Sequence, residues 1–305
     1  MRIFNKYRFG QSDGRAFLIA VLPIILYMAI CTAVLMICSS VSSFIFYKNN
    51  IVEISDETIN ALSMPATGIA AAISIPFFIW LCKRYKQRRD ANKFAFIANA
   101  PLEDAIAVRD AAEADPKNVK LKEYIWCVLA GVFGALSLNT IIYIIDKGRH
   151  IEEYMESTGS LFDLPIIIQI IISIILVPFA EELVFRGAHY RALRERLEII
   201  PALIISSVFF GVYHWNLLQG IYAFLMGIIL ALCVEKYACV QASVICHVFA
   251  NAVIIAANST GLLGYLTVKN TVLGLILGVI MLGITLFTVL KILKVDAFRT
   301  KNADA

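Results

Sequence analysis

Residues 164–186 read LPIIIQIIISIILVPFAEELVFR, an apolar run that ends in two adjacent glutamates, Glu181 and Glu182, followed by Arg186. A run of about 20 apolar residues predicts a helix that crosses the hydrocarbon core of a bilayer. Ionisable side chains at that depth cost a few kcal/mol each, and they usually serve a pathway, a ligand or a reaction. This stretch therefore predicts a transmembrane helix with a functional site in it.

The rest of the chain has the composition of a membrane protein. Hydrophobic residues make up 60% of the sequence and charged residues 16%, whereas soluble chains are about half apolar and a quarter charged. We expect an all-α, polytopic transmembrane helix bundle, an integral multi-pass protein of a bacterial cell membrane. The apolar runs predict about eight spans: 16–47, 61–82, 124–145, 164–185, 199–218, 220–234, 240–257 and 271–293.

Basic residues occur in every second loop and at both ends of the chain. They gather in the N-terminal segment, in 83–89, in 186–196, at Lys236 and in 291–301, and the intervening loops are acidic or mixed. The positive-inside rule then places both termini in the cytoplasm. The net charge of +4 follows from this topology, so the expected surroundings are the lipid bilayer and no nucleic acid partner is predicted.

The chain contains no internal repeat and only one long stretch outside the predicted spans. The first apolar run is too long for a signal-peptide core and is predicted to be a retained signal anchor. A helix-like stretch, Leu102–Asp115, is expected in the connector, and the tail after Lys294 is expected to be disordered. We expect three regions: 1–163 with three spans and a cytoplasmic connector at 83–122, a core at 164–258, and a last span with a basic tail at 259–305.

Two later apolar runs also contain polar side chains in helical register. Phe210 and His214 are four residues apart, and so are His247 and Asn251, so each pair should share one helix face. Glu182 and Arg186 have the same spacing and are predicted to form an ion pair. Each polar residue alone also fits a simpler interpretation, such as an interfacial charge or an amide that joins two helices.

Together these residues supply two carboxylates, two imidazoles and a carboxamide from three helices. A carboxylate can activate water while His and Asn donors stabilise an oxyanion, which is the chemistry of amide hydrolysis. Alternatively, Glu181, His214 and His247 could act as three ligands of a catalytic Zn²⁺. No HExxH motif is present to favour zinc, and both alternatives stay open.

The order E-E-x-x-x-R, F-x-x-x-H and H-x-x-x-N on successive helices resembles the CAAX-protease and bacteriocin-processing (CPBP, or Abi) family. These intramembrane proteases are related to type II CAAX prenyl endopeptidases, and the resemblance covers about residues 164–258. It implies that Glu181 is the water-activating base, that Glu182 is its partner and that Arg186 orients both. The resemblance also implies that the site is lined by His214, His247 and Asn251.

The function predicted on this basis is intramembrane hydrolysis of a small membrane-associated peptide or protein near the cytoplasmic face. The family is often described as metalloproteases, and a metal-free mechanism driven by glutamate has also been argued for its relatives. A different class remains open, a non-catalytic membrane scaffold or immunity protein of the same fold that acts by binding a partner. A transporter that uses the buried carboxylates is a third and weaker alternative.

The expected depths of the site residues disagree. At about 1.5 Å of rise per residue, Glu181 and His247 should lie nearer the cytoplasmic side, and His214 nearer the far side. Either the fifth span begins below the membrane, or it is strongly tilted.

Overall fold

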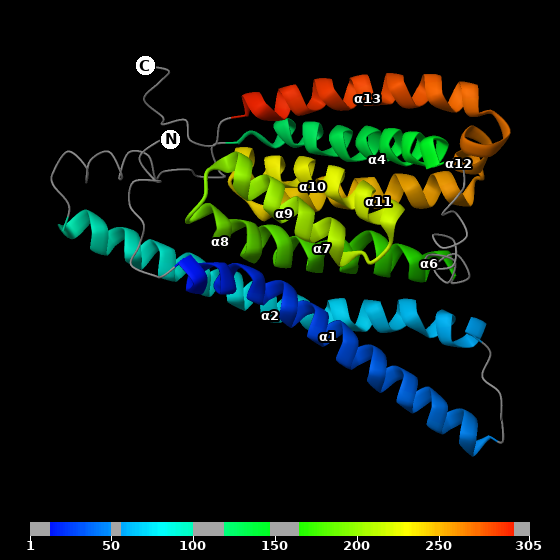
Figure 1. The fold of residues 1–305 in the computed structure, drawn as a ribbon, viewed down its shortest axis with the longest axis horizontal. Coiled ribbons are helices and arrows are strands. Elements are labelled where there is room, and N and C mark those ends of the chain that lie inside the picture. Colours follow the sequence, from blue (N-terminus) through cyan, green and yellow to red (C-terminus); the bar gives the residue numbers. More distant parts are fainter. Residues whose placement is uncertain (1–12, 50–55, 100–118, 147–164, 296–305) are drawn as a thin grey trace.

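The computed structural model describes residues 13–49, 56–99, 119–146 and 165–295, and every regular element within these ranges is a helix (Figure 1). Seven stretches are long and apolar enough to cross a membrane, which confirms the all-α, multi-pass architecture. The elements in chain order are α1 (Asp13–Lys48), α2 (Asp56–Asn99), η3 (Leu121–Tyr124), α4 (Ile125–Asp146), α6 (Ile166–Gln169), η4 (Ile170–Leu176), α7 (Val177–Glu182), η5 (Leu183–Tyr190), α8 (Arg191–Arg194), α9 (Ile199–Tyr213), α10 (Leu217–Tyr237), α11 (Val240–Ser259), α12 (Leu262–Gly264), η6 (Tyr265–Lys269) and α13 (Thr271–Lys294).

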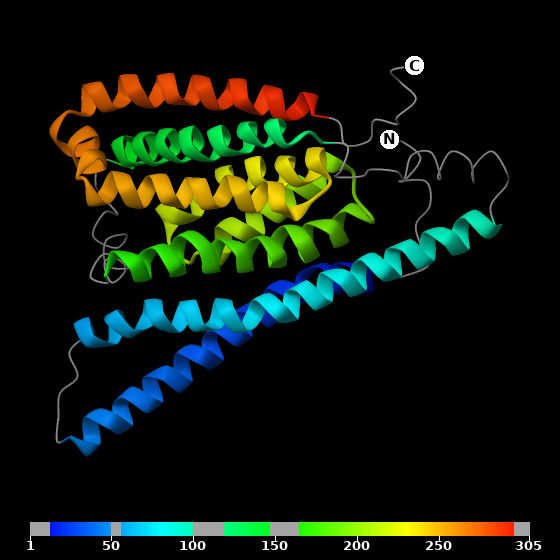
Figure 2. The same cartoon turned by 180° about the vertical axis from the view of Figure 1, so that it is seen from behind.

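The helices lie in layers (Figures 1 and 2). α4 and α13 pack together on one side, α1 and α2 lie on the other, and the helices from α6 to α11 lie between them. The C-terminal ends of α2, α8 and α13 lie on the same side of the bundle (Figure 1), and the later part of each of these helices contains basic residues, among them Lys83, Arg191 and Lys291. This arrangement agrees with the pattern that predicts cytoplasmic termini, and the assignment of that side to the cytoplasm stays a prediction.

The fourth span continues well beyond its predicted end near Phe185. From Ile166 to Arg194 it is one helical stretch in which the π-helical turns η4 and η5 flank α7, the segment that carries both glutamates. π-helical turns are rare and often occur at functional sites. Pro178 lies inside this stretch and cannot donate a backbone hydrogen bond to the preceding turn.

The boundary between the fifth and sixth predicted spans was placed wrongly. α9 has 15 residues and ends at Tyr213, whereas α10 has 21 residues and is the full-length helix of the two. The predicted spans 199–218 and 220–234 run through the turn, which consists of His214, Trp215 and Asn216, because apolar residues continue on both sides of these three. Asn216 caps α10 by accepting a hydrogen bond from a backbone N–H of the first turn at 3.0 Å.

The longer fourth helix and the shorter α9 explain the disagreement in depth. Arg194 lies thirteen residues after Glu181, and His214 lies fifteen residues after Ile199. Both separations correspond to roughly 20 Å of helix. The chain therefore runs from Glu181 to the turn after Arg194 and returns along α9 by about the same length. His214 therefore reaches the level of the glutamates without any unusual tilt.

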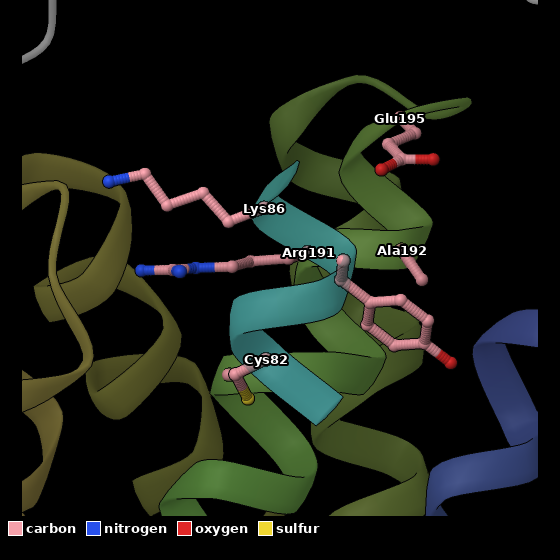
Figure 3. Close-up of a pocket in the computed structure, with 7 residues that line it drawn as sticks. Cys82, Lys86, Arg191, Ala192 and Glu195 are labelled. Carbon is pink, nitrogen blue, oxygen red and sulfur yellow. The ribbon is translucent and has the colours of Figure 1, made fainter. Parts of the chain in front are cut away.

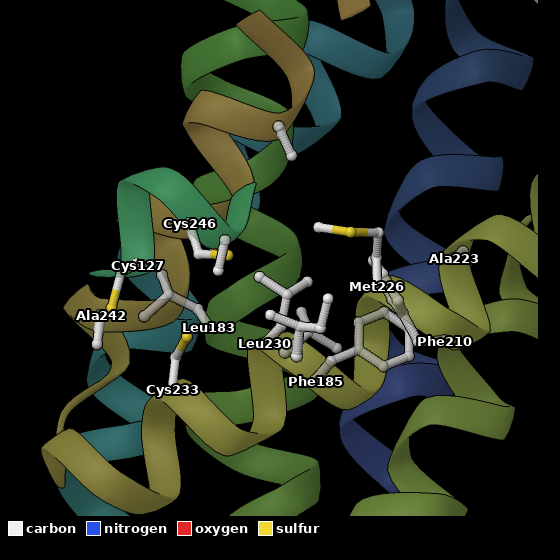
Figure 4. Packing of buried hydrophobic residues seen from close by; sticks show 14 of the residues in the cluster. Cys127, Leu183, Phe185, Phe210, Ala223, Met226, Leu230, Cys233, Ala242 and Cys246 are labelled. Atoms are coloured by element: carbon white, nitrogen blue, oxygen red, sulfur yellow. The ribbon is translucent and has the colours of Figure 1, made fainter. Parts of the chain in front are cut away.

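The core around the glutamates is packed with aromatic, aliphatic and cysteine side chains (Figure 4). Phe185, Phe210 and Leu230 are buried there together with the thiols of Cys233 and Cys246. α4 and α11 approach closely at Gly131, where a Cβ atom would lie 2.1 Å from the carbonyl oxygen of Cys246. Only glycine permits this approach, which fixes the position of the helix that carries the next residue, His247.

Several predictions fall on residues outside the described ranges. The helix-like stretch Leu102–Asp115 and the residues of the tail beyond 295 lie there. Part of the predicted connector is described: α2 continues without a break through Lys83 to Asn99, so this part is a helical extension of the second span.

Candidate active site

The ion pair predicted between Glu182 and Arg186 is present and fully buried. Nη1 of Arg186 donates to Oε1 of Glu182 at 3.0 Å, and neither side chain is exposed. Arg186 also donates from Nη2 to the carbonyl oxygen of Gly227 at 3.3 Å. Its guanidinium carbon lies 4.2 Å from the ring centre of Phe210, a cation–π contact. Arg186 thus joins η5 to α9 and α10.

His247 of α11 contacts the same carboxylate. Its Nδ1 lies 2.9 Å from Oε1 of Glu182, the oxygen that also accepts from Arg186. Because a carboxylate paired with arginine is ionised and can only accept, Nδ1 of His247 carries a proton and donates. Nε2 of His247 lies on the opposite side of the ring and is not engaged by Glu182.

Glu181 lies on that opposite side. Its Oε2 is 3.8 Å from Nε2 of His247, and 5% of the residue surface is exposed. This separation is too long for a direct hydrogen bond, yet one water molecule can contact two acceptors this far apart. The two adjacent glutamates therefore have different surroundings: Glu182 is paired with Arg186 and His247, and Glu181 faces Nε2 of His247 without a direct hydrogen bond to it.

Phe210 lies between the two histidines. Its ring centre is 4.9 Å from that of His214 and 5.8 Å from that of His247, and both contacts are edge-to-face. Nδ1 of His214 lies 2.7 Å from the carbonyl oxygen of Phe210, so it donates to the preceding turn and leaves Nε2 for other contacts. The predicted shared face of Phe210 and His214 is confirmed, and His214 is brought to the edge of the site.

Asn251 makes a hydrogen bond to the backbone of the fourth span. Its Nδ2 donates to the carbonyl oxygen of Ser173 at 2.8 Å. In η4 the N–H of Val177 donates to the carbonyl of Ile172, five residues back. The carbonyl oxygen of Ser173 would in the same pattern accept a hydrogen bond from the backbone of residue 178, five residues later. Residue 178 is a proline, which has no N–H to donate. Asn251 supplies the hydrogen bond that this proline cannot make, so a polar amide replaces a backbone group within the membrane span.

The predicted zinc ligands are brought together only in part. Glu181 and His247 face each other, and both histidines have Nδ1 engaged and Nε2 available, the arrangement that metal-binding histidines use. Within the described ranges, however, no three His, Cys, Asp or Glu side chains form a group that could hold a metal ion. Zinc binding stays a prediction.

Sequence reasoning missed two tyrosines at this site. Tyr27 of α1 and Tyr213 of α9 stack with ring centres 5.8 Å apart, and the carboxylate of Glu181 lies within Coulombic range of both phenols. Tyr213 directly precedes His214 in the sequence, which could have drawn attention to it. Tyr27 has no motif around it and lies outside the region of the family resemblance.

A separate small pocket lies where α2 passes α8 (Figure 3). Cys82, Lys86, Arg191 and Glu195 are among its lining residues, and Lys86 and Arg191 extend in the same direction. It contains none of the six predicted site residues. The carboxylate and imidazole groups described above are therefore the candidate active site.

Comparisons with known proteins point the same way. Residues 163–253 match the family described as type II CAAX prenyl endopeptidase Rce1-like. The chain is also 28% identical over 161 residues to a protein of Bacillus subtilis (strain 168) named "Putative membrane peptidase YdiL". That alignment covers 50% of this chain and 64% of the relative, somewhat less than two thirds of its length. No solved structure matches the chain.

The family match includes Glu181, Arg186, His214 and His247, and its range agrees with the region in which the three motifs occur. The resemblance predicted from those motifs is thereby confirmed. Through residues 163–253, this membrane protein is similar to the type II CAAX prenyl endopeptidases of the Rce1-like family and, in part of its length, to a relative named as a membrane peptidase.

Proposed function

We propose that this chain is an intramembrane endopeptidase that hydrolyses a peptide bond of a small membrane-associated peptide or protein near the cytoplasmic face. The observation that carries the proposal is the position of Glu181. Its buried carboxylate lies 3.8 Å from Nε2 of His247, whose other ring nitrogen is held by the Glu182–Arg186 pair. A free base beside an oriented imidazole is what peptide hydrolysis by water requires.

In the proposed reaction, Glu181 and Nε2 of His247 hold the attacking water between them. Glu181 takes a proton from this water as its oxygen bonds to the carbonyl carbon of the substrate. The tetrahedral intermediate then collapses, the C–N bond breaks, and the proton held by Glu181 passes to the leaving nitrogen. Glu182 and Arg186 act as positioning residues, because they fix the ring of His247 without reaching the water.

His214 and Asn251 have supporting roles in this proposal. Nε2 of His214 lies at the edge of the site, and Asn251 keeps a second Nδ2 hydrogen besides the one donated to Ser173. Either group can contact the substrate once it enters. If Zn²⁺ binds, Glu181, His214 and His247 would hold it, and the ion would polarise the carbonyl and acidify the water. The steps above use the protein groups alone.

The proposal is tested with the full chain purified in detergent and an internally quenched library of hydrophobic peptides. We expect cleavage by the wild-type protein and a loss of at least about 1,000-fold for Glu181→Gln, which keeps the shape but removes the base. Equal cleavage by both proteins would contradict the proposal. It would favour a scaffold of the same fold, which a complementation assay with Glu181→Gln would then support.

Chelation separates the two mechanisms. If the reaction uses the protein groups alone, 1,10-phenanthroline will leave turnover of the wild-type protein within about twofold. A large loss that is reversed by added Zn²⁺ but not by Mg²⁺ would instead show that the reaction depends on zinc. The peptidase proposal itself would survive that result, since both mechanisms use Glu181.

A further inference from the structure

The first helix of the chain contributes a buried face to the candidate site. Ala20, Ile24 and Tyr27 are spaced at i, i+4 and i+7 and are 1%, 4% and 0% exposed, so they form one stripe on α1. Nδ1 of His189 lies 2.7 Å from the carbonyl oxygen of Ala20, which fixes this stripe against η5. α1 is therefore held in a defined register two turns before Tyr27.

The ring of Tyr27 lies among residues that lead to the site. It stacks on Tyr213 and meets the ring of Phe78 edge-to-face at 6.0 Å. Tyr213 in turn contacts the rings of Phe185 and His214 at 5.4 Å. The phenol of Tyr27 also lies within Coulombic range of the Glu181 carboxylate. Tyr27 is thus joined through Tyr213 to His214, on the side of the candidate active site formed by α1 and α9.

Among the described residues this hydroxyl group makes no hydrogen bond of good geometry, although the residue is fully buried and the side chains of Tyr213 and Cys31 lie near it. Burying a hydroxyl group without a partner destabilises a fold, so most such groups in proteins are paired. Phenylalanine would fill the same space and make the same ring contacts without this cost. A buried donor that makes no good hydrogen bond within the protein is available to a ligand.

We propose that Tyr27 is a further catalytic residue, whose phenol donates a hydrogen bond to the carbonyl oxygen of the scissile peptide bond. This inference rests on the proposed peptidase function. Negative charge develops on that oxygen when water attacks the carbonyl carbon, and a preorganised donor in a dry site stabilises it. Tyr27 keeps its proton throughout; the proton of the water passes to Glu181 and then to the leaving nitrogen.

The test compares Tyr27→Phe with Tyr237→Phe, a matched control on α10. Tyr237 is also fully buried, but its hydroxyl group donates to the carbonyl oxygen of Glu123 at 2.6 Å. For Tyr27→Phe we expect kcat to fall about 100-fold or more on the best library peptide, with little change in KM and an unchanged or higher Tm. For Tyr237→Phe we expect the reverse, a lower Tm with kcat near that of the wild-type protein.

The outcomes separate the two proposals. If the wild-type protein cleaves no better than Glu181→Gln, both the peptidase function and the role of Tyr27 are wrong. If it cleaves and Tyr27→Phe has wild-type kcat, only the role of Tyr27 is overturned. A fall in kcat accompanied by a lower Tm would also overturn it, because that pattern indicates a structural residue.

Discussion

Oε1 of Glu182 accepts hydrogen bonds from Nη1 of Arg186 at 3.0 Å and from Nδ1 of His247 at 2.9 Å. One buried oxygen thus joins the fourth span to α11 and sets the orientation of the imidazole that faces Glu181. The neighbouring glutamates divide the work between them. In the proposed reaction, Glu182 fixes the positions of Arg186 and His247, and Glu181 is the base.

This division predicts opposite effects on stability and turnover. Glu182→Ala leaves the fully buried Arg186 without its partner, and breaking a buried ion pair on one side costs about 3–5 kcal/mol. Glu181→Gln makes no such gap, so we expect its unfolding temperature to stay close to that of the wild-type protein while its turnover is lost. Thermal unfolding of both variants in the same detergent measures the difference.

A double variant provides the control. Glu182→Leu with Arg186→Met replaces the pair by apolar side chains of similar length, and such replacements are often neutral in stability. We expect it to recover most of the unfolding temperature but little turnover, because His247 has lost the acceptor for Nδ1. The interpretation fails if Glu182→Ala unfolds at the same temperature as Glu181→Gln.

The hydrogen bond from Asn251 to Ser173 leads to a second prediction. Asn251→Ala leaves a buried carbonyl unpaired, which should cost about 1–3 kcal/mol. Pro178→Ala restores a backbone N–H at the position that can donate to that carbonyl. We therefore expect Pro178→Ala to reverse most of the instability of Asn251→Ala, as a double-mutant cycle of unfolding temperatures would measure.

Turnover of the wild-type protein, Asn251→Ala, Pro178→Ala and the double variant tests whether Asn251 also contacts the substrate. If turnover recovers together with stability, Asn251 acts only through η4. If stability recovers and turnover does not, its second amide hydrogen contributes to the reaction, as the family resemblance implies. A double variant as unstable as Asn251→Ala would show that Ser173 does not need the bond.

The close approach of α4 to α11 gives a third prediction. A Cβ atom on residue 131 would lie 2.1 Å from the carbonyl oxygen of Cys246, so Gly131→Ala must displace the helix that carries His247. We expect both a lower unfolding temperature and a loss of turnover. Gly283→Ala on α13 is the matched control, because nothing lies within 4 Å of its added Cβ; it should gain up to about 1 kcal/mol from helix propensity. Similar behaviour of the two variants would contradict this account.

Much of the fold could be predicted from apolar runs, because a helix that meets lipid must be apolar along a length set by the bilayer. The Glu182–Arg186 pair could also be predicted, since both residues belong to one helical stretch and their spacing is local. The end of the fourth span could not be predicted in this way. Gly187, Ala188 and Tyr190 continue the helix through π-helical turns, and no period of 3.6 residues reveals a turn of that kind.

The linear order of residues was sufficient to identify the three motifs, the helices that carry them and the family that residues 163–253 resemble. Three relationships depend on the packing of helices far apart in the chain. They are the hydrogen bond between Glu182 and His247, the pairing of Asn251 with the carbonyl left open by Pro178, and the stacking of Tyr27 on Tyr213. Residue spacing encodes contacts within one helix, whereas contacts between helices depend on register and close approach, which only the assembled bundle defines.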